Sequence, residues 1–154
     1  MIDDSRRQLV DNVRIAIAQQ HSSEAVLRVA VELIDAFSEN FNWTGVYMLD
    51  GDILRVGPYV GPETPHKEIK LNSGICGAAV SQKETILVND VTSDPRFLAC
   101  SPFTRSEIVV PLRDGDDVIG EIDIDSNQTS NFTGADREML ELIAESLVDR
   151  LKQI

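Results

Sequence analysis

Hydrophobic residues recur at helical spacing at both ends of the chain. One run lies within residues 5–20 and a second within residues 26–37, directly after Ser22 and Ser23, either of which can cap a helix. A third run occupies residues 133–154, where Thr133 and Asp136 have the spacing of a capping box. The pattern therefore predicts two helices before residue 40 and an amphipathic helix at the C-terminus.

The middle of the chain changes to short segments rich in β-branched and aromatic residues. Residues 43–49 and 53–60 flank Asp50-Gly51, and residues 106–112 and 118–125 flank Asp114-Gly115-Asp116, so each pair predicts a β-hairpin. Shorter strands are expected at residues 67–71 and 85–88. A short helix is expected at residues 74–82, with Ser73 as its cap, and a long loop at residues 89–103.

These elements favour an α+β fold in which an antiparallel sheet of five or six strands is flanked by helices. We expect one domain over residues 1–154, composed of an N-terminal helix (1–20), a sheet core (21–132) and a C-terminal helix (133–154). Neither an internal repeat nor a linker interrupts this order.

Composition narrows the range of partners. The 26 acidic residues outnumber the 14 basic ones, which gives a formal net charge of −12 and argues against nucleic-acid binding. Charged residues interrupt every hydrophobic segment, and the chain opens without a secretory signal pattern. We therefore expect a cytoplasmic protein that does not enter a membrane.

Acidic side chains gather on the last predicted hairpin. Asp123 and Asp125 are two residues apart in a strand and share a face. If the hairpin loop consists of residues 114–116, Glu107 lies directly opposite Asp123, and mutual repulsion would raise the pKa of at least one carboxyl group. Such a group could donate a proton, although alternating acid and isoleucine also suits a half-exposed strand without chemistry.

An aromatic wall is expected on the first predicted strand. Trp43, Gly45 and Tyr47 share one face, where the glycine could open a small cavity beside the two rings. Ordinary packing of a sheet accounts for the same pattern, so the strand alone does not decide between the two.

The two cysteines, Cys76 and Cys100, lack the clustered spacing of a zinc site and are too few for a disulfide scaffold. Cys76 falls in the first turn of a predicted helix, where the helix N-terminus could stabilise a thiolate, and Cys100 falls on the long loop. Two inert thiols are the alternative. We expect no metal ion, and His66 is interpreted as a loop histidine.

Several segments, taken in order, resemble the free methionine-(R)-sulfoxide reductases, a catalytic branch of the GAF-domain family. The resemblance runs from about residue 41 to residue 132. The matching segments are Asn42-Trp43-Thr44-Gly45-Val46-Tyr47, Gly57-Pro58-Tyr59-Val60-Gly61, Gly74-Ile75-Cys76-Gly77, Leu98-Ala99-Cys100, Ser106-Glu107-Ile108-Val109-Val110-Pro111 and Ile122-Asp123-Ile124-Asp125-Ser126.

The resemblance implies a role for each matching residue. Cys100 takes the place of the catalytic cysteine and Cys76 that of a second family cysteine. The acidic residues around the substrate correspond to Glu107, Asp123 and Asp125, and the aromatic wall corresponds to Trp43 and Tyr47. A third cysteine of the family is replaced here by His66.

The implied reaction is thiol-dependent reduction of free methionine-(R)-sulfoxide, with Glu107 or another acid as proton donor and with no bound cofactor. It would pass through a sulfenic acid on Cys100 and a disulfide with Cys76, which a thioredoxin-type reductant reopens. A homodimer is implied by the family. The alternative is a noncatalytic GAF module that binds a small ligand and signals. The cyclic-nucleotide signature is absent, and the residue after Cys100 is serine where bilin-binding members have histidine.

Overall fold

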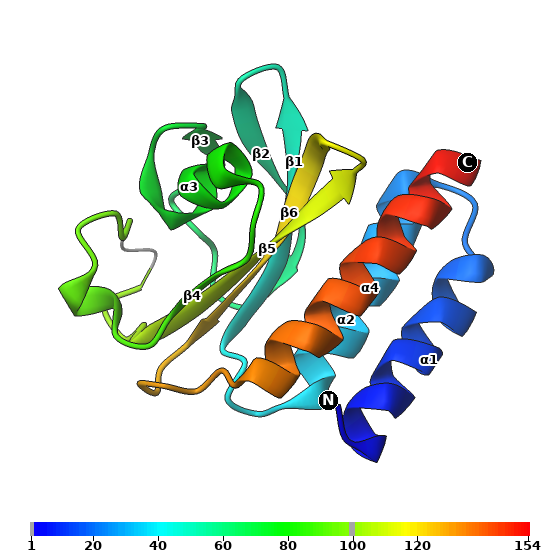
Figure 1. The fold of residues 1–154 in the computed structure, drawn as a ribbon, viewed down its shortest axis with the longest axis horizontal. Coiled ribbons are helices and arrows are strands. Elements are labelled where there is room, and N and C mark those ends of the chain that lie inside the picture. Colours follow the sequence, from blue (N-terminus) through cyan, green and yellow to red (C-terminus); the bar gives the residue numbers. More distant parts are fainter. Residues whose placement is uncertain (1, 99–100) are drawn as a thin grey trace.

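The computed structural model describes residues 2–98 and 101–154. A six-stranded sheet forms the centre of the molecule in the order β3-β2-β1-β6-β5-β4, and every neighbouring pair is antiparallel (Figure 1). The strands are β1 (Trp43–Asp50), β2 (Ile53–Val60), β3 (Glu68–Lys70), β4 (Ile86–Val88), β5 (Ser106–Asp114) and β6 (Asp117–Ser126). The predicted α+β class with an antiparallel sheet is confirmed.

Helices cover the two faces of this sheet unequally. The long helices α2 (Ser23–Phe37) and α4 (Gly134–Gln153) pack on one face, and α1 (Asp4–Ala18) packs against these two helices on their outer side (Figure 1). The short helix α3 (Gly74–Gln82) lies on the other face, against β5 and β6. A single-turn 3-10 helix, η1 (Val91–Ser93), follows β4.

Alternation along the central strands divides the core into two parts. Ile122 and Ile124 of β6 point toward α2 and α4, together with Val46 and Ile108 from the neighbouring strands, and all four are fully buried. The intervening residues of β6 point toward α3. The apolar face therefore anchors the long helices and leaves the α3 face for other chemistry.

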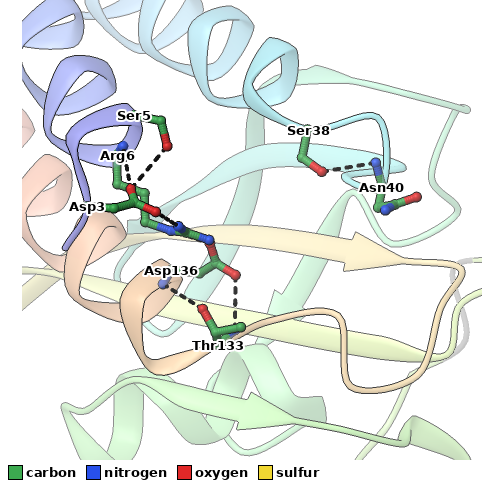
Figure 2. A network of polar contacts seen from close by, with 7 residues as sticks. All are labelled: Asp3, Ser5, Arg6, Ser38, Asn40, Thr133 and Asp136. Carbon is green, nitrogen blue, oxygen red and sulfur yellow. Dashed lines mark hydrogen bonds and ion pairs between the residues drawn. The ribbon is translucent and has the colours of Figure 1, made fainter. Parts of the chain in front are cut away.

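Polar side chains fix the ends of α1 and α4. Thr133 and Asp136 form the predicted capping box, which is thereby confirmed, and Ser22 rather than Ser23 caps α2. Figure 2 shows that Asp136 is also bound by Arg6, whose Nε and Nη2 lie 2.9 and 2.8 Å from Oδ1. Arg6 in turn contacts Asp3, the cap of α1. This network ties the first turn of α1 to that of α4.

Both predicted hairpins form, each with its turn one residue later than an Asp-Gly turn would place it. The turn residues are Gly51-Asp52 and Gly115-Asp116, and each glycine adopts a positive φ, 65° and 63°. A positive φ at the first central residue suits glycine in tight hairpin turns. In the second hairpin the register also shifts between Leu112 and Arg113.

Within residues 2–98 and 101–154, no helix combines the length and the apolar character needed to span a bilayer.

Candidate functional site

Three neighbouring strands present a regular grid of side chains to α3. Because β1, β6 and β5 are adjacent and antiparallel, residues two apart on each strand align in rows across the sheet. The three rows are Trp43–Asp125–Glu107, Gly45–Asp123–Val109 and Tyr47–Glu121–Pro111. Four carboxyl groups from this grid, those of Glu107, Glu121, Asp123 and Asp125, are buried and are called the acidic cluster below.

The predicted pairing of Glu107 with Asp123 is wrong. Glu107 lies opposite Asp125, and Asp123 lies opposite Val109. The loop has two residues instead of three, which shifts the pairing by one position, and the irregularity between Leu112 and Arg113 shifts it by another. A total shift of two keeps the side chains on the same face, so Glu107, Asp123 and Asp125 still meet.

Glu121 is a fourth member of the cluster, which the sequence pattern did not predict. It lies two residues before Asp123 on β6, so it shares the face of Asp123 and Asp125 and is completely buried. The signal was present in the sequence as a third acid in the same alternation. A half-exposed strand would have placed Glu121 in solvent, and only tertiary packing under α3 buries it.

Cys76 extends from α3 into the cluster. Its Sγ lies 3.5 Å from Asp123 Oδ2, and one ligand atom each of Cys76, Glu107 and Asp123 lie within 4.8 Å of one another. Burial and the charges of Asp123, Glu121 and Glu107 raise the pKa of the Cys76 thiol well above its usual range. Burial and the neighbouring carboxylates thus oppose the stabilisation of a thiolate that the helix N-terminus could provide.

All four carboxyl groups of the cluster have raised pKa values, and burial is the leading cause for each. The charge of Asp123 further raises the pKa values of Glu107, Glu121 and Asp125. Like charges in a confined space favour retention of protons at neutral pH. The cluster can therefore hold acidic protons that exposed carboxylates would have lost.

Several oxygens of the cluster lack hydrogen bonds. Among the described residues, both carboxyl oxygens of Glu121, Oδ1 of Asp123 and Oδ1 of Asp125 are buried without a partner. No ion pair within residues 2–98 and 101–154 involves any of the four groups. Buried polar atoms of this kind are uncommon in native proteins and are frequent at functional sites.

The aromatic wall stands beside the cluster. The Trp43 ring stacks with the rings of both Tyr59 and Tyr47, whose centroids lie 5.3 and 6.1 Å away. Trp43 Nε1 donates to the carbonyl of Pro62 at 3.1 Å, and Tyr47 Oη donates to that of His66 at 2.7 Å. These bonds fix the loop before β3 against the wall.

The cavity expected at Gly45 is absent because the Trp43 indole fills that space. A Cβ atom on Gly45 would lie 2.5 Å from Trp43 Cη2 and 2.7 Å from Tyr59 Cβ. Glycine is therefore required here to let the indole lie flat on the strand.

Two hollows adjoin the grid instead. One, of about 10 Å³, is lined by Tyr47, His66, Cys76, Glu107 and Asp123 among others. The other, of about 250 Å³, is lined by Trp43 and Asp125 together with Ser101, Phe103 and Thr104 among others. The predicted site residues Trp43, Tyr47, Cys76, Glu107, Asp123 and Asp125 are thus brought together, whereas Cys100 lies outside the described residues.

Comparison with known sequences places the chain in a family. Residues 20–151 match the sequence model of the GAF domain. The chain belongs to the GAF-domain family. It is 37% identical over 109 residues to GAF domain-containing protein A of Dictyostelium discoideum, a match that covers 70% of this chain and 68% of that protein.

Other similar proteins are named for an enzymatic activity. The chain is 38% identical over 109 residues to the free methionine-R-sulfoxide reductase of Saccharomyces cerevisiae. The matched region covers 68% of this chain but only 60% of the yeast protein. The solved free methionine-R-sulfoxide reductase of Neisseria meningitidis, in complex with its substrate, superimposes with a TM-score of 0.92 at 29% identity. That superposition covers 99% of this chain and 92% of the Neisseria chain.

Proposed function

We propose that this GAF domain reduces free methionine-(R)-sulfoxide to methionine. The observation that carries the proposal is a buried cluster of four carboxyl groups and one thiol beside stacked aromatic rings. Similarity to the reductases of yeast and Neisseria supports this choice of reaction. The alternative, a noncatalytic module for a small ligand, would use the same hollows without turnover.

In the proposed reaction Cys100 is the nucleophile. The oxygen of the sulfoxide passes from the substrate sulfur to Cys100, so that the substrate becomes a thioether and Cys100 becomes a sulfenic acid. A carboxyl group that retains its proton at neutral pH can protonate the departing oxygen, and Glu107 is our choice because it lies beside both Asp123 and Asp125. No bound cofactor is needed for this transfer.

Recycling of the enzyme is assigned to Cys76. Its thiol would condense with the sulfenic acid, forming a disulfide and releasing water, and a thioredoxin-type dithiol would then reduce the disulfide. Because the Cys76 thiol has a raised pKa, its proton must leave before it can attack, and Asp123 at 3.5 Å is placed to accept it. We expect the protein to be a cytoplasmic homodimer and the disulfide to be reduced there.

The unpaired carboxyl groups offer a basis for substrate choice. A free amino acid carries an ammonium group that can pair with carboxylates, whereas a methionine residue within a peptide does not. Removing one partner of a buried charged hydrogen bond costs about 2–5 kcal/mol, enough for a preference of about thirtyfold to several thousandfold. The 250 Å³ hollow beside Trp43 and Asp125 is large enough for an amino acid.

The test is an assay of purified protein with dithiothreitol, supplied separately with the R and S epimers of free methionine sulfoxide and with the N-acetyl R epimer. We expect methionine to form from the free R epimer and turnover to vanish in Cys100→Ser. Binding of the R epimer without turnover would favour the noncatalytic module. Equal rates on the free and N-acetyl forms would show that the substrate's ammonium group does not contribute to recognition.

Cys76→Ser separates the two proposed thiol roles. We expect a single turnover by the reduced variant to proceed at nearly the normal rate, while sustained turnover with a thioredoxin system falls. An equal loss in both measurements would contradict the division of labour between Cys76 and Cys100.

A further inference from the structure

We infer that Cys76, Glu107 and Asp123 form a binding site for a divalent transition-metal ion of the Zn²⁺ class. One ligand atom from each residue lies within 4.8 Å of the other two, and Cys76 Sγ lies 3.5 Å from Asp123 Oδ2. Zinc binds thiolate sulfur at about 2.3 Å and carboxylate oxygen at about 2.0–2.2 Å, so tetrahedral ligands lie about 3.3–3.7 Å apart. A small inward movement of these side chains is enough to bind zinc.

The space between these ligands has the size of one ion or water. The hollow lined by Cys76, Glu107 and Asp123 is about 10 Å³. A cavity needs roughly 10–15 Å³ to hold a single water molecule, so a metal ion with an exchangeable water on its open side suits it and a larger ligand does not. Three protein ligands and one open position are the usual arrangement of an accessible zinc centre.

Unpartnered oxygens point to a missing positive charge. Asp123 lines the hollow, and its Oδ1 has no hydrogen-bond partner among the described residues. Glu121 is completely buried beside the Cys76 thiol, and no ion pair within the described part of the chain involves it. A dication would compensate these buried acids, which no ion pair among the described residues does.

The donor set selects the type of metal. Oxygen ligands alone would suit Mg²⁺ or Ca²⁺, but a thiolate ligand favours Zn²⁺ or Co²⁺ over these hard cations. On binding, the Cys76 thiol gives up its proton to solvent and its sulfur bonds to the metal, with no change of oxidation state. Sequence spacing does not reveal this site, because its ligands come from α3, β5 and β6.

The test uses reduced, metal-free protein and Co²⁺ as a spectroscopic substitute for Zn²⁺. We expect one Co²⁺ per chain, a near-ultraviolet thiolate-to-cobalt charge-transfer band, and bleaching of that band by Zn²⁺. Cys76→Ser should abolish the band. Glu107→Gln and Asp123→Asn should each lower metal affinity by at least about tenfold, because even outer-shell substitutions cost about 10–100-fold.

Two variants serve as matched controls. Cys100→Ser keeps the Cys76 thiol and should keep the band, whereas Asp35→Asn removes a partly buried carboxyl group whose partner is Thr44 and should leave affinity unchanged. Loss of the band in Cys100→Ser with its retention in Cys76→Ser would overturn the assignment, as would absence of any band in the wild-type protein. If Cys76→Ser fails to fold, the two carboxyl variants decide. The ion would occupy the Cys76 thiol and the Glu107 carboxyl group that the proposed reaction uses, so metal binding and turnover exclude one another. The readout here is binding to the metal-free protein, so its outcome is separate from that of the activity assay.

Discussion

One buried carboxylate, Asp136, and the four carboxyl groups of the acidic cluster have opposite surroundings. Asp136 receives bonds from Arg6 and from the Thr133 amide, so its charge is compensated at the start of α4 (Figure 2). The acidic cluster on the other face of the sheet has several buried oxygens without a partner in the described residues. Both sites are buried, but only Asp136 has hydrogen-bond and charge partners from the protein itself, without a ligand.

This difference separates a structural role from a functional one. A buried charge with its own cation and hydrogen bonds can hold two helices in register at little cost. A buried acid without them destabilises the fold and persists when it serves binding or catalysis. The contrast therefore predicts that substitutions in the acidic cluster will lower activity, whereas substitutions at Asp136 will lower the free energy of unfolding.

The largest expected effect is on catalysis at the acidic cluster. Glu107→Gln cannot donate a carboxylic proton, so we expect kcat/KM for free methionine-(R)-sulfoxide to fall by about 10²–10⁴-fold, the usual contribution of a general acid. Steady-state kinetics measure this loss. Asp136→Asn should keep kcat/KM near the wild-type value below its unfolding temperature. Normal kinetics in Glu107→Gln would contradict the assignment of a functional role to the acidic cluster and of a structural role to Asp136.

The next effect is on stability at Asp136. Asp136→Ala removes both the carboxylate that completes the capping box with Thr133 and the buried partner of Arg6, so we expect the free energy of unfolding to fall by about 2–4 kcal/mol. Urea denaturation followed by circular dichroism gives this value. A loss below 0.5 kcal/mol, within the range of an exposed pair, would show that the network contributes nothing special.

A smaller effect of opposite sign is expected at Glu121. Burial raises its folded pKa above the ordinary 4.5, so its contribution to stability is fully present below pH 4.5 and is lost as the pH rises toward the folded pKa. Glu121→Gln does not titrate, so the free energy of unfolding at pH 8 should exceed the wild-type value by about 1–2 kcal/mol. Denaturation at pH 5 and pH 8 compares the two proteins, and an unchanged pH dependence would contradict this reasoning.

The smallest effect provides the baseline. Glu24 and Arg28 form an exposed pair one turn apart on α2, with 3.0 Å between their charged atoms. Glu24→Ala should change the free energy of unfolding by about 0.5 kcal/mol or less, because water and salt screen such pairs. A change as large as that expected for Asp136 would mean that burial does not distinguish the Asp136–Arg6 pair from an exposed pair.

Local patterns were sufficient to predict most of the fold. The caps at Ser22 and Thr133, the two hairpins and the short helix from Gly74 to Gln82 all follow from residues close in sequence. Strand alternation likewise predicted that Asp123 and Asp125 share a face. These features depend on the geometry of single elements, which short stretches of sequence determine.

The features that sequence patterns could not predict depend on contacts between distant segments. The pairing of Glu107 with Asp125 required the position of the turn and of the irregularity after Leu112, neither of which the hydrophobic pattern specifies. The raised pKa of the Cys76 thiol depends on burial and on carboxylates about 30 to 50 residues away in the sequence. The sequence of its own helix gives no information about these neighbours. The burial of Glu121 similarly depends on packing beneath α3.

The stacked rings beside the cluster have an optical consequence. The chain contains one tryptophan and two tyrosines, and the Trp43 ring stacks with both Tyr47 and Tyr59. Light absorbed by either tyrosine passes readily to the indole at such short range, so the emission spectrum of the whole chain originates at one wall. Any molecule or ion that enters beside Asp125 or Asp123 will alter the surroundings of this one fluorophore, and the protein thus carries a built-in reporter of its own occupancy.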